Sequence, residues 1–252
     1  MKNLHHLMYI ALFFSGLILI TGCNEMEAPI PADAGQQSLL KSGDDDDGDD
    51  DGGAQIPFDE VEVFFEFNTT DNDLGFQLFL DAEGWKQVNV FGPDGKIINF
   101  KAKRALKELG ITELRFESSE PSPAEVLALF PPGDYKFRGR TVEGDKLVGT
   151  GELSHAFLAA PSIFVNGDPI NGDPVDPDST VIGWDAPGAE RVQVIVGNED
   201  LGHFFDVIVS PETTSLNVPP QFLQPATEYK AEVLAISANG NRTITEGTFV
   251  TE

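Results

Sequence analysis

The fold is decided by residues 223–235, LQPATEYKAEVLA. Alternate residues of a β-strand point to the same face, so from Tyr229 onward every second side chain of this stretch faces one way. The placement of Leu223, Pro225 and Tyr229 predicts a tyrosine corner, in which the phenol hydroxyl bonds to the backbone a few residues upstream. Such a corner locks the chain where it crosses between the two sheets of a β-sandwich.

Around this stretch, residues 161–252 consist of short alternating runs separated by Gly, Pro, Asn and Asp, which is typical of a sandwich. A first strand led by proline covers 161–165, Trp184 lies on the second strand, and 239–241 turn into the last strand. Together with the tyrosine corner, these landmarks resemble a fibronectin type III domain. The resemblance implies a spacer or a binding module, and a fold of this kind implies no chemistry by itself.

The preceding segment, residues 56–160, also shows the period of β-strands. Apolar residues alternate along 61–67, and turn signals at 93–95 and 143–145 predict two hairpins. One short helix is expected near 122–130, where a capping box precedes an apolar run. We expect a second β-sandwich here, immunoglobulin-like in type, so the predicted fold class is all-β with two consecutive sandwiches.

The first 22 residues have the features of a secretory signal peptide, with Lys2 followed by an almost wholly apolar run over 7–20. Residues 20–23, ITGC, resemble the bacterial lipobox. The resemblance implies that Cys23 carries a diacylglycerol and becomes the acylated amino terminus after cleavage. Asn24, in place of Asp, then favours the outer membrane of the cell envelope. A plain signal peptide and an uncleaved anchor helix are the alternatives.

Residues 23–55 are expected to form a disordered acidic tether, because they lack apolar periodicity and contain seven aspartates over 44–51. The whole chain has 42 acidic and 16 basic residues, a formal charge of -26, which disfavours a nucleic-acid partner. Its one cysteine excludes a disulfide framework.

Calcium is the one metal that the acidic residues suggest, since Ca²⁺ takes carboxylate and carbonyl oxygens. The candidate ligands outside the tether are Asp71 and Asp73 in one loop, and Asp168, Asp173, Asp176 and Asp178 in another. Ordinary acidic turns between strands account for both loops equally well. No other cofactor is expected.

Two further groups of side chains are candidates for ligand binding. The only basic cluster comprises Lys101, Lys103, Arg104 and Lys107, with Lys136, Arg138 and Arg140 on one face of a later strand. It is suited either to pairing with nearby acids or to an anionic ligand. The second hypothesis is an exposed aromatic strip that stacks on sugars, formed by Trp85, Phe64, Phe79 and Phe91. Core packing is the alternative.

An enzyme is not expected. Beyond the leader the chain has only His155 and His203, and His155 follows Ser154 directly, so the two side chains point to opposite faces of a strand. The sequence therefore favours a lipid-anchored envelope protein with a binding or structural role. The alternatives are a carbohydrate-binding or adhesion module and a calcium-stabilised envelope protein. The expected partners are the membrane, through the lipid, and an unidentified protein or glycan.

Overall fold

The computed structural model describes residues 54–252, so the leader, Cys23 and the aspartate run lie outside the described residues. The described part consists almost entirely of β-strands, with two short α-helices and one 3-10 turn, which confirms the all-β fold class. None of the helices within it is long and apolar enough to cross a bilayer.

The elements before residue 160 are β1 (Gln55–Pro57), β2 (Glu60–Asn68), β3 (Asp73–Gly92), β4 (Gly95–Lys101), α1 (Ala105–Leu109), β5 (Ile111–Glu117), α2 (Pro123–Leu129), β6 (Gly133–Thr141) and β7 (Lys146–Leu153). The later elements are β8 (Ser162–Val165), β9 (Asp168–Pro169), β10 (Pro174–Val175), η1 (Pro177–Ser179), β11 (Val181–Asp185), β12 (Arg191–Asn198), β13 (His203–Val209), β14 (Ser215–Asn217), β15 (Glu228–Ile236) and β16 (Arg242–Thr251).

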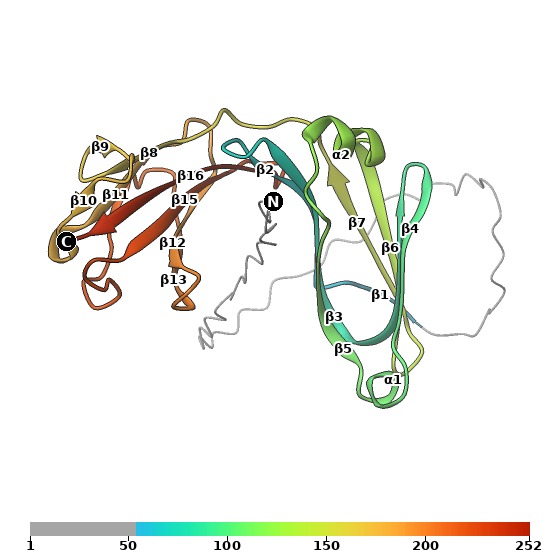
Figure 1. The fold of residues 1–252 in the computed structure, drawn as a ribbon. Helices are drawn as coiled ribbons and strands as arrows, with labels where there is room; N and C mark the ends of the chain where they lie inside the picture. Colours follow the sequence, from blue (N-terminus) through green and yellow to red (C-terminus); the bar gives the residue numbers. More distant parts are fainter. Residues whose placement is uncertain (1–53) are drawn as a thin grey trace, which may run out of the picture. The chain divides into compact units, whose positions relative to one another are not determined.

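Two sheets hold these strands together (Figure 1). The larger has the order β1-β7-β6-β3-β2-β16-β15-β12-β13, with β4 and β5 paired to β3 and β10 paired to β16. The smaller has the order β14-β11-β8-β9. The larger sheet therefore runs without a break from the strands before residue 160 to those after it.

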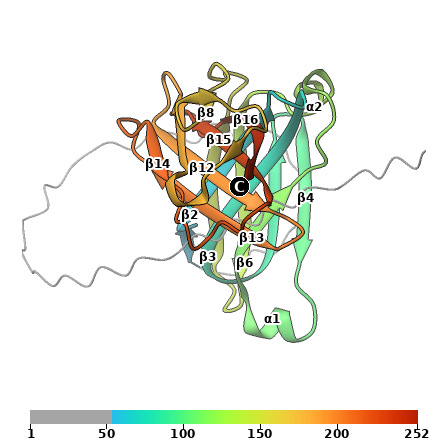
Figure 2. The ribbon, with the colours of Figure 1, turned by 60° about the vertical axis from the view of Figure 1, so that its left-hand side comes forward.

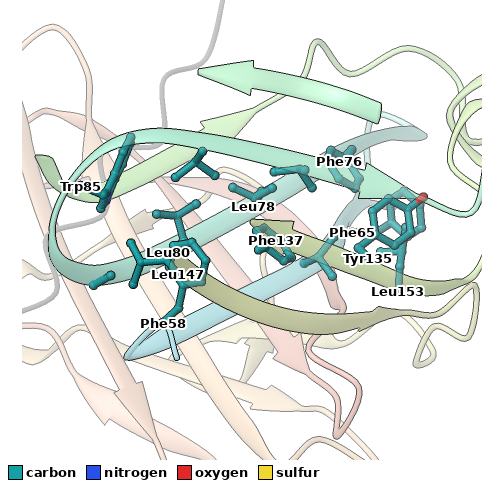
Figure 3. Packing of buried hydrophobic residues seen from close by; sticks show 14 of the residues in the cluster. Phe58, Phe65, Phe76, Leu78, Leu80, Trp85, Tyr135, Phe137, Leu147 and Leu153 are labelled. Atoms are coloured by element: carbon teal, nitrogen blue, oxygen red, sulfur yellow. The ribbon is translucent and has the colours of Figure 1, made fainter. Parts of the chain in front are cut away.

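β3 is one strand of 20 residues, in which the apolar alternation appears as two runs, at 76–80 and at 88–90. Its first half pairs with β2 and β5, and its second half pairs with β4 and β6. The register shifts on either side of Trp85. Such bulges bend a strand, and Figure 3 shows β3 curving around the first core.

The first core is rich in aromatic side chains (Figure 3). Phe76 stacks on Phe130 with the ring centroids 4.1 Å apart and the planes at 4°. The hydroxyl of Tyr135, whose side chain is buried, donates to the carbonyl of Pro131 at 3.0 Å. Since a buried hydroxyl without a partner is costly, this bond lets a tyrosine occupy the core.

The second core lies between the smaller sheet and the strands β12, β15 and β16, and contains Trp184, as the sequence predicted. The predicted tyrosine corner is confirmed. Tyr229 is fully buried, and its hydroxyl accepts from the Gln224 N–H at 2.8 Å and lies 3.4 Å from the Phe222 carbonyl. Leu223 is buried beside it. The corner thereby fixes the loop that leads into β15.

The predicted hairpins and helix are also present. β3 and β4 turn at Pro93 and Asp94, and β6 pairs with β7 across the turn at 142–145. In α2, the Glu125 carboxylate accepts from the Ser122 N–H at 3.2 Å and from its hydroxyl at 2.6 Å. The first is the bond that the capping box predicts for Glu125, and it satisfies a backbone donor at the start of the helix, whereas the second joins the two side chains.

The two halves meet where β16 pairs in parallel with β2, with Arg242 opposite Glu66 and Ile244 opposite Asn68. Asn241, only 1% exposed, reinforces this junction. Its side chain accepts from the Phe65 N–H at 2.9 Å and donates to the Ser154 carbonyl at 2.8 Å. The pairing satisfies backbone groups that two separate sandwiches would leave open at their edges.

Candidate binding surface

The basic residues of β6 lie on one face of the larger sheet. Lys136, Arg138 and Arg140 are alternate residues of one strand, so their side chains point the same way. The opposite face of β6 carries Tyr135 and Phe137, which are buried in the first core. The cations therefore line the outer surface of the sheet.

The strand register extends this surface across four strands. Gln87 of β3 lies opposite both Lys101 of β4 and Arg140 of β6, and Arg140 lies opposite Lys146 of β7. Residues directly opposite one another share a face. We call this surface the basic face. Its cations are Lys96, Lys101, Lys136, Arg138, Arg140 and Lys146.

An aromatic ring holds two of these cations. The Arg138 guanidinium carbon lies 5.4 Å and the Lys96 ammonium nitrogen 5.3 Å from the centroid of the Phe91 ring. Both distances suit a cation–π contact. Asn99 donates to the Asn89 side chain at 2.8 Å beside them. Asp134 and Glu152, which lie opposite one another, carry negative charge at the far end of the same strands.

The remaining residues of the predicted basic cluster occupy a projection that we call the tip, residues 103–109. It comprises Lys103, Arg104 and α1, and it extends beyond the ends of the strands (Figures 1 and 2). The Ala102 N–H donates to the Lys86 carbonyl at 2.8 Å on one side of it, and Ile111 pairs with Trp85 on the other. The sequence placed the cations of this cluster together but missed the helix.

The tip is both basic and apolar. Lys103, Arg104 and Lys107 are exposed, and α1 buries none of its residues. Leu106 is 50% exposed and Leu109 is 78% exposed. These leucines are not packed into a core, so they give the tip an exposed apolar surface next to its cations.

A close approach of two glycines forms the neck of the tip. Gly110 has a φ of +86°, and a Cβ atom there would lie 2.8 Å from the Cα atom of Gly84. The Val142 N–H donates to the Gly84 carbonyl at 3.0 Å, so the turn after β6 packs at the same end. Only glycine fits both this backbone conformation and this spacing.

A second group of charged residues gathers at the junction of β2 and β16. Glu66, Glu117 and Glu120 each offer a carboxylate oxygen, and these oxygens lie within 4.8 Å of one another. Arg242 lies 3.2 Å from the Glu66 carboxylate and stacks over the Phe64 ring at 4.4 Å. The sequence pattern placed Glu66 and Phe64 on the solvent side of the strand, but the junction buries both.

The junction raises the pKa values of two of these carboxyls. Burial raises the pKa of Glu66 to about 7, against the stabilising charge of Arg242. Loss of solvent and the charges of Asp73 and Glu117 raise the pKa of Glu120 to about 7. A group of three carboxylates suits Ca²⁺, but the Glu66 carboxylate already forms an ion pair with Arg242. The group can take up protons close to neutral pH.

The candidate calcium ligands are spread among turns. Asp71 accepts from the Asn68 side chain at 3.4 Å, and Asp73 begins β3. Asp173 accepts from the Asn171 side chain at 2.9 Å. Asp176 accepts from the Asp178 N–H at 2.9 Å. None of these, nor Asp168, belongs to the close carboxylate group found within residues 54–252, and calcium binding by them stays a prediction.

The aromatic strip predicted for sugar binding is wrong. Trp85 is 0% exposed, and its indole N–H donates to the Thr112 carbonyl at 3.1 Å within the first core. Phe64 and Phe79 are also buried, under Arg242 and Arg115 respectively. The physical reason is that β5 and β16 pair beside β3 and β2 and place Arg115 and Arg242 over these two rings, which an isolated hairpin would leave open.

The two histidines have separate structural surroundings. His155 lies with its Nε2 atom 2.8 Å from the Phe130 carbonyl and packs against the Phe65 ring. His203 packs against Phe222 in the second half of the chain. Neither contact brings a histidine to a nucleophile, so these side chains offer no acid–base pair of the kind that catalysis needs.

Known proteins resemble this chain only distantly. No protein-family model matches it, and no curated protein matches it. Among solved structures, the FN1-FN3 domains of chicken CNTN1 share 13% identity over 79% of this chain and 66% of that chain, with a TM-score of 0.34. A two-domain fibronectin type III segment of chicken tenascin shares 12% identity over 75% of this chain and 96% of that one, at 0.26.

A bacterial structure gives a similar result. The fibronectin(III)-like modules of Clostridium thermocellum CbhA share 11% identity over 80% of this chain and 90% of that one, with a TM-score of 0.28. At such low scores these likenesses carry no argument about ligand or partner. The binding surface has to be argued from the residues of this chain.

Proposed function

We propose that this protein is a lipid-anchored, non-catalytic binding module of the bacterial cell envelope, and that its basic face holds an anionic ligand. The observation that supports this is the strand register, which gathers six of the chain's 16 basic residues on one sheet face although acidic residues number 42. Such a face attracts anions locally in a protein that repels them elsewhere.

Cross-strand neighbours argue against a purely stabilising role. Opposite charges across a strand pair stabilise a sheet, and like charges destabilise it. Yet Lys101 faces Gln87, Lys136 faces Thr150 and Arg138 faces Val148, so the register sets no acid directly opposite these three cations. Cations arranged in this way are better suited to a negatively charged ligand than to the stability of the sheet.

The proposed anchor is Cys23, on the evidence of the lipobox. Metabolic labelling with a fatty acid, followed by detergent partition, tests it in cells. We expect Cys23→Ala to abolish labelling and to move the protein out of the membrane fraction. Recovery of the variant in the membrane fraction at the wild-type level would contradict the anchor.

The binding surface is tested with a soluble polyanion, polygalacturonate, and the chain from residue 24 onward. Reversing two charges in Arg138→Glu/Arg140→Glu should weaken binding by about tenfold or more, since each reversal exchanges an attraction for a repulsion of about 1 kcal/mol even in water. The control is Arg191→Glu, which reverses an exposed cation on β12. Equal losses in the control and the double variant would show that net charge, and not the basic face, causes binding.

A further inference from the structure

We propose that the tip, residues 103–109, docks on an anionic lipid bilayer, with Leu106 and Leu109 entering the boundary between headgroups and acyl chains. This goes beyond the proposed ligand of the basic face, because it names a second surface and a second partner. It rests on the lipid anchor only for the presence of a membrane nearby.

Two leucines are exposed on one short helix of the tip, α1. Leu109 has the largest exposed fraction, 78%, among the large hydrophobic side chains of the described residues, and Leu106, 50% exposed, precedes it by three residues on the same short helix. The backbone of the helix closes on itself, with the Gly110 N–H donating to the Leu106 carbonyl at 3.0 Å. Both side chains are therefore presented outward on an ordered turn.

The charge on the tip has the sign that an anionic bilayer requires. Lys103, Arg104 and Lys107 are exposed there against one acid, Glu108. Lys101 continues the positive surface at the neck. Basic residues next to exposed apolar ones are the combination by which peripheral proteins bind anionic lipid surfaces, since each lysine or arginine attracts the headgroups while the apolar side chains enter the interface.

The position of the tip suits a chain anchored through its N-terminal segment. The described chain begins at Ala54, whose carbonyl accepts from the Lys146 N–H at 2.7 Å and whose N–H donates to the Asp145 carboxylate at 2.9 Å. Asp145 and Lys146 lie where the turn between β6 and β7 ends, and this turn packs against the neck of the tip through Val142. The chain therefore enters the fold at the end from which the tip projects (Figures 1 and 2).

The size of the tip favours a bilayer over a protein partner. A specific protein interface buries roughly 800 Å² on each partner and needs a shaped surface of about 20 residues or more. The tip offers seven residues on a projection, with α1 burying none of its own. A fluid lipid interface accepts such a small, protruding apolar group without a complementary pocket.

Vesicle flotation tests this with the chain from residue 24 onward, without lipid on Cys23. This part retains every strand and both hydrophobic clusters, which lie within the compact unit 50–252. We expect it to float with vesicles of equal parts phosphatidylglycerol and phosphatidylcholine and to stay behind with phosphatidylcholine alone. Leu106→Ser/Leu109→Ser and Lys103→Glu/Arg104→Glu/Lys107→Glu should each lower binding to the anionic vesicles at least fivefold.

The matched control is Leu129→Ser, which removes a leucine that is 70% exposed on α2, a helix without a basic residue in its last turn. It should bind like the wild type. Equal binding by the wild type and the double-serine variant, or equal binding to neutral vesicles, would overturn the proposal. So would an equal loss in Leu129→Ser.

A second measurement does not depend on loss of binding. Leu109→Trp places an indole on the tip, whereas Trp85 and Trp184 are buried in the two cores. Its emission should shift to the blue on anionic vesicles, and an unshifted spectrum on bound protein would overturn insertion. Leu106→Ser/Leu109→Ser should still bind polygalacturonate. Loss of vesicle binding alone therefore concerns the tip, and loss of polygalacturonate binding concerns the basic face.

Discussion

Glu66 and Arg242 form an ion pair across the junction of β2 and β16, with an N–O distance of 3.2 Å and the Glu66 residue 6% exposed. The two residues are 176 positions apart in the sequence, and they lie directly opposite one another in the strand register. Removing one partner of a buried pair leaves the other charge uncompensated, so this pair couples the two halves of the described chain.

The first prediction concerns pH. The folded pKa of Glu66, about 7, lies above its ordinary value of 4.5, so between these values the folded state binds more protons than the unfolded state. Stability from this group is therefore fully present below about pH 4.5 and is lost as the pH rises through 7. We expect the melting temperature to decrease between pH 5 and pH 8, and Glu66→Gln to flatten that decrease.

Thermal melts followed by circular dichroism measure this effect. The comparison variant is Glu62→Gln on the same strand, which lies outside the close carboxylate group. A decrease of unchanged steepness in Glu66→Gln would show that another group titrates.

The second prediction concerns the tyrosine corner. Tyr229→Phe removes the acceptor of the Gln224 N–H and leaves that donor without its partner. We expect a loss of about 1–3 kcal/mol in the free energy of unfolding. Urea melts of the chain from residue 24 onward measure it, and an unchanged midpoint would show that the corner contributes nothing to stability.

The third prediction concerns the neck of the tip. Gly110→Ala requires a φ of +86° from alanine and places a Cβ atom 2.8 Å from the Cα atom of Gly84. We expect a loss of about 1–3 kcal/mol from the strained backbone alone. Gly144→Ala is the control, since its φ is also positive, +109°, but its Cβ would meet nothing within 4 Å. An alanine at 110 that costs less than an alanine at 144 would contradict the close approach.

The fourth prediction concerns calcium. A tight site needs carboxylate and carbonyl oxygens that converge without a large ordering cost. Asp71, Asp173 and Asp176 instead bond within separate turns, Asp178 shares the turn of Asp176, and Asp73 and Asp168 begin the strands β3 and β9. We therefore expect no site tighter than about 10⁻⁴–10⁻³ M. Titration calorimetry on the chain from residue 24 onward checks this. Micromolar calcium binding that survives removal of residues 24–53 would contradict this and would favour a calcium-stabilised envelope protein.

The sequence by itself determined the features that depend on neighbouring residues. Alternation along 229–235 and the spacing of Leu223, Pro225 and Tyr229 specified a strand and its corner, since both arise within about a dozen residues. The same holds for the hairpin at Pro93 and the capping of α2 by Ser122 and Glu125, where local backbone geometry and nearby hydrogen bonds decide the outcome.

Only the tertiary structure decided which strand faces are covered and which cations meet. Alternation gave no reason to bury Phe64 and Glu66, because the strand that pairs with β2 there and supplies Arg242, β16, lies about 180 residues away in the chain. Trp85 is likewise buried by the curve of a strand that bulges, a property of pairing on both sides. Lys101 joins Arg140 on the basic face because both pair with β3 in a register that no local pattern specifies.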